Sequence, residues 1–103
     1  MREMKELQTL KDNWEEFLKF MKEHYPLYHL SNVFVRDIEY AIKNYFLNKG
    51  KKISFAEAEY LAQRFAEFLV EKGIFKTVKN EFNRVWTLNY PEFKKQGVKE
   101  TEK

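Results

Sequence analysis

Residues 54–76, SFAEAEYLAQRFAEFLVEKGIFK, contain the start, the buried face and the end of one helix, followed by the beginning of a strand. Ser54, with Glu57 three residues later, forms the capping-box pattern that marks a helix start. Apolar residues then recur at intervals of three and four, the spacing of one helical face. These residues are Ala58, Leu61, Ala62, Phe65, Phe68 and Leu69. Gly73 suits the left-handed conformation that ends a helix, so the pattern predicts a helix over residues 55–72.

A first helix is predicted over residues 2–24, and it ends before Pro26 because proline disfavours a helical residue in front of it. Its apolar residues form one stripe. The stripe consists of Leu7, Leu10, Trp14, Phe17 and Met21. Two interpretations remain open. The stripe packs on the other helices, or it pairs with a second copy, since the same spacing is typical of a short coiled-coil seam. The second interpretation predicts a homodimer formed through the N-terminal helix.

A second helix is predicted between these two. Residues 28–30 are expected to be a short extended segment, and Ser31 or Asn32 to cap the helix that follows. Gly50 suits the left-handed position after the helix, which ends at about Asn48. The apolar residues at helical spacing are Phe34, Ile38, Ala41, Ile42 and Tyr45.

The C-terminal part predicts a β-hairpin. Residues 74–78 and 84–88 are rich in β-branched and aromatic residues, and a polar loop joins them. Residues 93–103 contain few apolar residues and are expected to form a frayed polar tail. Residues 1–92 are therefore expected to form one domain, mainly α-helical with a small β-hairpin.

The composition excludes several classes of protein. The 103 residues suffice for one hydrophobic core. The chain has no cysteine and two histidines, so we expect no disulfide and no metal site. Three glycines build no phosphate-binding loop, and no nucleophile motif occurs, so we expect neither an enzyme nor a cofactor. No segment has the length of a membrane span or a signal-peptide core, so we expect a cytoplasmic protein without membrane contact. The excess of Lys and Glu is typical of thermophile proteins.

The segment Leu69-Val70-Glu71-Lys72-Gly73-Ile74-Phe75-Lys76 resembles the winged helix-turn-helix superfamily. In that group a leucine, polar residues, a glycine, two apolar residues and a basic residue lead from the recognition helix into the wing. The Leu30–Ser31 step is similar to the family's short first strand and cap. The resemblance covers about residues 5–90 and implies a three-helix domain whose third helix is the recognition helix and whose residues 74–88 form the wing. In members that bind DNA, this helix lies in the major groove.

The resemblance implies a small transcriptional regulator that binds double-stranded DNA. Tyr60, Gln63 and Arg64 on the third helix are expected to contact base edges. Phosphate contacts are expected from basic side chains in the turn before this helix and on the wing. These residues are Lys49, Lys51, Lys52, Lys76, Lys79 and Arg84.

The charge of the third helix favours an alternative. Residues 55–72 hold two basic residues against four glutamates, a net charge of −2, and phosphates repel an acidic helix. Aromatic residues make up 17% of the chain, more than a small core readily buries. The alternative function is a winged-helix protein–protein interaction module in a larger assembly, without direct DNA binding. The net charge of the whole chain, +3, does not decide between the two.

Overall fold

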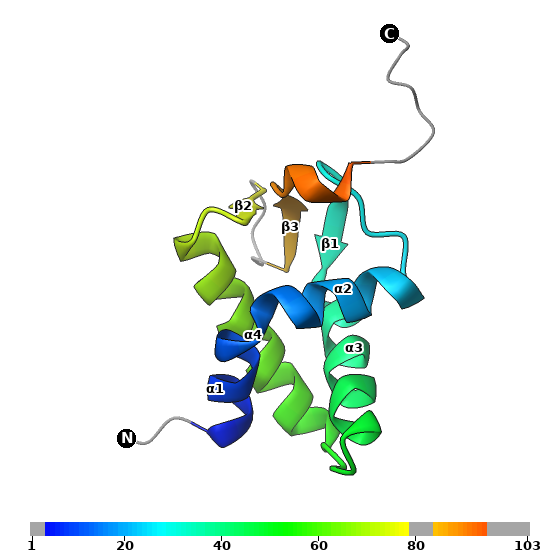
Figure 1. Ribbon diagram of the computed structural model, residues 1–103. Coiled ribbons are helices and arrows are strands. Elements are labelled where there is room, and N and C mark those ends of the chain that lie inside the picture. The colour runs from blue at the N-terminus through cyan, green and yellow to red at the C-terminus, as the bar shows by residue number, and fades with distance from the viewer. Residues whose placement is uncertain (1–3, 79–83, 95–103) are drawn as a thin grey trace, which may run out of the picture.

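The computed structural model describes residues 4–78 and 84–94. Its elements in chain order are α1 (Lys5–Asp12), α2 (Trp14–His24), β1 (Asn32–Phe34), α3 (Val35–Asn48), α4 (Phe55–Glu71), β2 (Phe75–Thr77), β3 (Val85–Leu88) and a short 3₁₀ helix, η1 (Pro91–Phe93). Helices α3 and α4 pack side by side, α1 packs on α4, and α2 crosses α3, while the sheet lies at one end of the helical body (Figure 1). The described chain is therefore mainly helical with a small sheet, as predicted.

The sheet has three antiparallel strands in the order β1-β3-β2. The predicted hairpin segments form β2 and β3, and β1 adds a third strand that was not predicted at its position. Val33 lies opposite Trp86, and Phe75 lies opposite Leu88. All four side chains are buried. Because side chains alternate along a strand, one face of the sheet closes the helical core.

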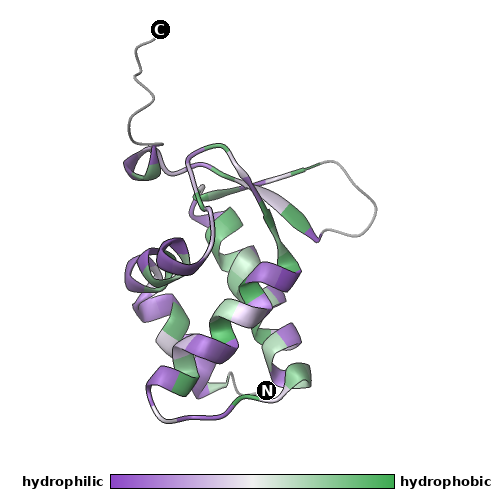
Figure 2. Cartoon of the chain, turned by 90° about the vertical axis from the view of Figure 1, so that its right-hand side faces the viewer, coloured by the Kyte–Doolittle hydropathy of each residue, from purple (hydrophilic) through white to green (hydrophobic). Residues whose placement is uncertain are grey.

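Aromatic rings join the helices at the centre of the core. The Phe17 ring of α2 lies edge-on to Phe65 of α4 and to Tyr45 of α3, with ring centroids 5.2 Å apart in both pairs. Such pairs contribute about 0.5–1.5 kcal/mol each beyond the buried area. Hydrophobic and hydrophilic residues alternate around the helices, as a shared core requires (Figure 2).

The predicted first helix is two helices, α1 and α2, which run in different directions (Figure 1). Asn13 separates them, with φ −122° and ψ 36°. Its side-chain amide donates to the Thr9 carbonyl at 2.9 Å. Asparagine competes with helical hydrogen bonds by such local contacts, which explains the break.

The apolar stripe of these two helices belongs to the core. Leu7, Leu10, Phe17 and Met21 are at most 2% exposed within the single chain. Trp14 is half-buried and lies edge-on to Tyr90, with ring centroids 5.8 Å apart. Burial within one chain supports the core interpretation, and a homodimer formed through the stripe stays a prediction.

Residues 28–30 form a turn, so the predicted extended segment is wrong. The Ser31 hydroxyl donates to the Tyr28 carbonyl at 2.7 Å. Leu30 has a φ of +72°, which is uncommon outside turns for a residue of this kind. The strand begins one residue after the turn closes, at Asn32.

Helix α3 begins at Val35 without a side-chain cap, so the predicted cap at Ser31 or Asn32 is also wrong. The Val35 amide instead donates to the Arg84 carbonyl at 2.9 Å. This long-range bond satisfies one of the amides that a helix start leaves free. Phe34, which was predicted on the buried stripe, precedes the helix and is 52% exposed.

The ends of α4 follow the prediction. The Ser54 hydroxyl accepts from the Glu57 amide at 3.2 Å, and the Glu57 carboxylate accepts from the Ser54 amide at 3.1 Å, which completes the capping box. Gly73, after the helix, has a φ of +81°, and Gly50, after α3, has a φ of +85°. Both glycines therefore hold the left-handed conformation predicted for them.

The body of the domain extends past the predicted boundary at residue 92. Phe93 is buried, and its carbonyl accepts from the His29 amide at 2.9 Å. Its ring lies edge-on to Tyr90, with centroids 4.9 Å apart. The predicted tail thus includes one core residue, and residues 95–103 lie outside the described part of the chain.

We expect Ser54→Ala to lower the free energy of unfolding by about 1 kcal/mol, because the Glu57 amide loses its acceptor, the Ser54 hydroxyl. For a domain of this size the melting temperature should fall by about 4–8 °C. Ser54→Asp is the matched control, since it keeps an acceptor oxygen at the cap and should melt close to the parent protein. An unchanged melting temperature in Ser54→Ala would contradict a stabilising role for the capping box.

We expect Leu10→Ala to lower the free energy of unfolding by about 2–5 kcal/mol, because the side chain is fully buried. Urea unfolding followed by circular dichroism measures the change at a low and a high protein concentration. The loss should be equal at both concentrations, since Leu10 packs within one chain. Lys19→Ala, on the exposed side of α2, is the control. A midpoint that rises with concentration would instead place the stripe in a dimer interface.

Candidate functional site

Two lysines of the α3–α4 turn contact the N-terminal helices. The turn lies at the end of the molecule opposite the sheet (Figure 1). Lys51 Nζ lies 2.7 Å from the Glu6 carboxylate of α1, and this contact lowers the pKa of the Glu6 carboxyl. Lys49 Nζ lies 4.0 Å from the Glu16 carboxylate of α2 and 4.9 Å from the centre of the Tyr45 ring. Lys49 and Lys51 are therefore directed toward α1 and α2 and not toward the hairpin.

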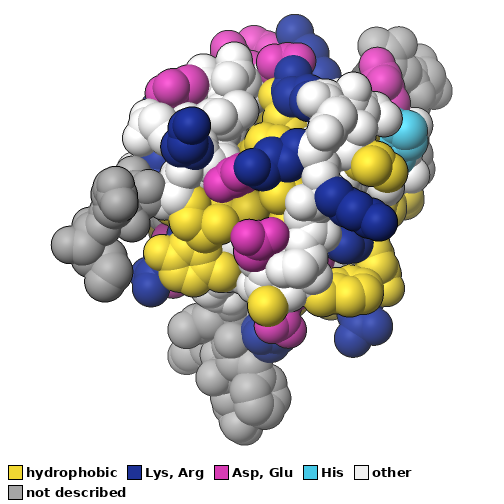
Figure 3. Space-filling view, turned by 90° about the horizontal axis from the view of Figure 1, so that it is seen from below, with side chains coloured by type: hydrophobic (Ala, Val, Ile, Leu, Met, Phe, Trp, Pro, Cys, Tyr) yellow, Lys and Arg dark blue, Asp and Glu magenta, His cyan; other side chains and the backbone are white. Residues whose placement is uncertain are grey.

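The other predicted phosphate contacts are dispersed. Lys52 precedes α4, Lys76 lies on β2 and Arg84 precedes β3, and all three are exposed. Lys79 lies outside the described residues. Seen from the end that carries the α3–α4 turn, Lys and Arg side chains are interspersed with acidic and hydrophobic ones (Figure 3). This face shows no continuous basic patch.

The predicted base-contacting residues of α4 lie among glutamates. Arg64 is 3.3 Å from the Glu67 carboxylate, and its guanidinium lies 5.3 Å from the centre of the Tyr60 ring. Gln63 is half-buried and lies one helical turn after Glu59. Tyr60 and Arg64 thus lie side by side and line a pocket that Leu7 and Lys11 of α1 also line, whereas Gln63 lines the pockets toward α3 and the hairpin. Glutamates of α4 lie in all three pockets.

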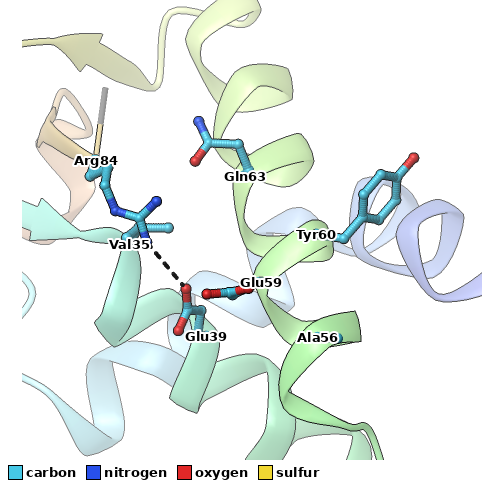
Figure 4. A pocket seen from close by; sticks show the side chains of 7 residues that line it. All are labelled: Val35, Glu39, Ala56, Glu59, Tyr60, Gln63 and Arg84. Atoms are coloured by element: carbon cyan, nitrogen blue, oxygen red, sulfur yellow. Dashed lines mark ion pairs between the residues drawn. The ribbon is translucent and has the colours of Figure 1, made fainter. Parts of the chain in front are cut away.

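An open pocket of about 330 Å³ lies between α3 and α4 beside these residues. Glu39 of α3 and Glu59 of α4 point toward one another across it, and Arg84 extends into it from the residue before β3 (Figure 4). Its lining residues are Val35, Glu39, Ala56, Glu59, Tyr60, Gln63 and Arg84. An adjoining pocket shares Val35, Glu39, Glu59 and Arg84 and continues to Phe34. We call the two pockets together the α3–α4 groove.

Glu39 is the one buried charged side chain among residues 4–78 and 84–94, with 8% of its surface exposed. Arg84 lies 3.8 Å away, too far for a hydrogen bond. Burial raises the pKa of the Glu39 carboxyl, the Glu59 carboxylate raises it further, and Arg84 and Arg36 lower it. Burying a carboxylate beside such a loose partner costs stability. Groups held in this way concentrate at functional sites.

Exposed apolar side chains lie on the elements that form the groove, and Phe34 and Tyr60 line it. Tyr40 of α3 and Phe55 of α4, which adjoin Glu39 and Ala56 in the sequence, lie edge-on with ring centroids 6.4 Å apart. The large hydrophobic side chains that are at least 41% exposed come mainly from β1, α3 and α4. They are Phe34, Tyr40, Leu47, Phe55 and Tyr60 on these elements and Leu30 in the preceding turn. We call Phe34, Tyr40 and Phe55 the aromatic rim.

Neither Glu39 nor the rim was predicted from the sequence. Phe34 was predicted to be buried, and Glu59 entered only as one of the four glutamates that make residues 55–72 acidic. The available signal was spacing, because Glu39 follows Val35 by four residues and so lies on the same helical face. The approach of Arg84 to Glu39 depends on the pairing of β1 with β3, and the spacing of residues along α3 does not reveal that pairing.

Comparison with known protein families, with curated proteins and with solved structures found no match to this chain. No described helix is long and apolar enough to cross a bilayer. Within residues 4–78 and 84–94, no three His, Cys, Asp or Glu side chains are grouped to hold a metal ion. The site is therefore interpreted from its own geometry.

We expect Glu39→Gln to stabilise the protein at neutral pH. Folding raises the pKa of this carboxyl, so the parent protein loses stability as the pH rises through the folded pKa. The glutamine variant has no carboxyl to ionise at this position, so it does not lose stability in this way. Its melting temperature should exceed that of the parent near pH 7, and the difference should shrink toward about pH 4. A variant less stable than the parent near neutral pH would show that the contact with Arg84 outweighs the burial.

Proposed function

We propose that this chain is a winged helix-turn-helix domain that acts as a protein–protein interaction module, and that its partner binds in the α3–α4 groove. The order of the elements supports the family, since a short strand precedes two helices and a hairpin. The pairing of that strand with the hairpin supports it as well. The acidic surface of α4 is the main observation that favours a protein partner over DNA.

Helix α4 carries four exposed glutamates and one exposed arginine, a net charge of −3 over Phe55–Glu71. The arginine, Arg64, pairs with Glu67. Duplex DNA binding depends on basic side chains that neutralise phosphates and release counterions. A helix with this charge repels the phosphates on both sides of the major groove, which argues against its insertion there.

The groove has the features of a protein-binding surface. Aromatic side chains are enriched at the centres of protein interfaces, where they contribute much of the binding energy. The aromatic rim supplies three such side chains, each at least 41% exposed. The carboxylates of Glu39 and Glu59 line the groove, which Phe34 also lines, and they give the surface a polar part that selects among partners.

Duplex DNA is the second candidate, favoured by the basic residues near the hairpin. Lys76 is exposed on β2, and Arg84 adjoins β3. In this function the hairpin contacts the DNA backbone, and α4 contributes little. Such contacts are few, so the affinity is low and strongly dependent on salt.

Fluorescence anisotropy with random-sequence duplex DNA separates the two candidates. We expect no saturable binding below about 100 µM at about 200 mM salt, because a DNA-binding domain binds non-specifically in the range of about 1–100 µM. Lys52→Ala with Lys76→Ala is the informative variant, since it leaves the contacts of Lys49 and Lys51 with α1 and α2 intact. Tight binding that weakens steeply with salt and is lost in this variant would establish DNA as the ligand.

Selection of a random peptide display library on the folded chain tests the protein partner directly. We expect peptides that bind the parent protein and lose at least about tenfold in affinity on Tyr40→Ser with Phe55→Ser, because the rim supplies the apolar contacts. The double variant loses the Tyr40–Phe55 ring pair, so it should melt somewhat below the parent, and thermal unfolding verifies that it is folded at the temperature of the binding assay. Leu30→Ser, an exposed apolar residue outside the groove, is the control. A selection without rim-dependent peptides contradicts the proposed function.

A further inference from the structure

We infer that the partner inserts one lysine or arginine side chain between Glu39 and Glu59. This inference rests on the proposed function, a protein bound in the α3–α4 groove, and it names the side chain that the groove recognises. It follows from the charge of the groove, from the shape of its walls and from the positions of the chain's own cations.

The groove lacks one positive charge. Its first pocket contains two carboxylates, those of Glu39 and Glu59, and one cation, Arg84. In the adjoining pocket Arg36 and Asp37 balance each other. Among the described residues, no ion pair is formed by Glu59. A single added cation neutralises the site, and neutralisation offsets the cost of burying Glu39.

Lys43 and Arg84, two neighbouring cations of the chain, do not fill this place. Lys43, one turn after Glu39 on α3, donates to the Ile53 carbonyl at 2.7 Å and lies 4.7 Å from the centre of the Phe55 ring. Arg84 stays 3.8 Å from Glu39, with half of its side chain exposed. The carboxylates therefore face a pocket that a cation from outside can enter.

The walls of the pocket suit a long basic side chain. Val35 and Ala56 are apolar and line the same pocket as the two carboxylates. Lysine and arginine pack their aliphatic stems along apolar surface while the charged head contacts carboxylates. Phe34 of β1 lines the adjoining pocket, and Tyr40 and Phe55 adjoin the lining residues Glu39 and Ala56 in the sequence. The expected partner segment is a basic residue flanked by apolar residues.

The same peptide selection tests this inference. The enriched peptides should share one Lys or Arg between apolar residues. The best peptide, made synthetically with a fluorescent label, should bind at least about tenfold more weakly to Glu39→Gln with Glu59→Gln, and also when its basic residue is replaced by glutamine. Glu23→Gln, an exposed carboxylate on α2, is the matched control and should leave binding unchanged. Thermal unfolding of each variant verifies that it folds.

The outcomes separate the inference from the proposed function. Peptides that depend on the rim but carry no basic residue, or that bind the double glutamine variant as tightly as the parent, overturn the inference and leave the protein-binding function in place. Failure to recover any rim-dependent peptide overturns both. Loss of binding in the double glutamine variant, with the control unchanged, establishes the carboxylate pair as the recognition site.

Discussion

The antiparallel pairing of β1 with β3 is the constraint on which the rest of the structure depends. It joins segments more than 50 residues apart, with Val33 opposite Trp86, and it places the Arg84 carbonyl against the first amide of α3. The same pairing buries Trp86 over the helices and sets the Arg84 side chain beside Glu39. The core, the start of α3 and the α3–α4 groove therefore all rely on one strand register, because a shift of one residue would reverse the faces of β3.

The buried carboxylate of Glu39 lowers the stability of the folded domain. A hydrophobic side chain at that position would extend the contact between α3 and α4, whereas the carboxylate is desolvated and has only a loose ion pair. Isolated charges buried in this way destabilise a fold unless a partner supplies the missing charge. A domain of this size has a small margin of stability. The simplest physical account is that the Glu39 carboxylate serves binding. A cation of the partner would then neutralise the charge that Arg84, 3.8 Å away, neutralises only in part.

Local patterns predicted the elements that local interactions determine. The Ser54–Glu57 capping box, the apolar face of α4 and the left-handed Gly73 all depend on residues within a few positions of one another, and all were correct. The start of α3 was wrong because its amide is satisfied by Arg84, which is distant in sequence. The break at Asn13 was missed because the apolar stripe continues on both sides of it. The candidate groove was missed for a related reason, since it is assembled from two helices and the end of a hairpin.

The count of charges was the least informative part of the sequence, because it does not show which charges neutralise one another. The chain is positive overall, yet Lys51 and Lys49 face carboxylates of α1 and α2, and the glutamates of α4 face outward. The charged residues that line the groove are therefore three carboxylates and two arginines, a net charge of −1 in a basic protein. In the proposed function, aromatic contacts at the rim supply affinity to many apolar partners, whereas the two carboxylates of the groove penalise any partner that places an apolar or acidic group there. Selectivity in that function comes from the charge that the groove lacks.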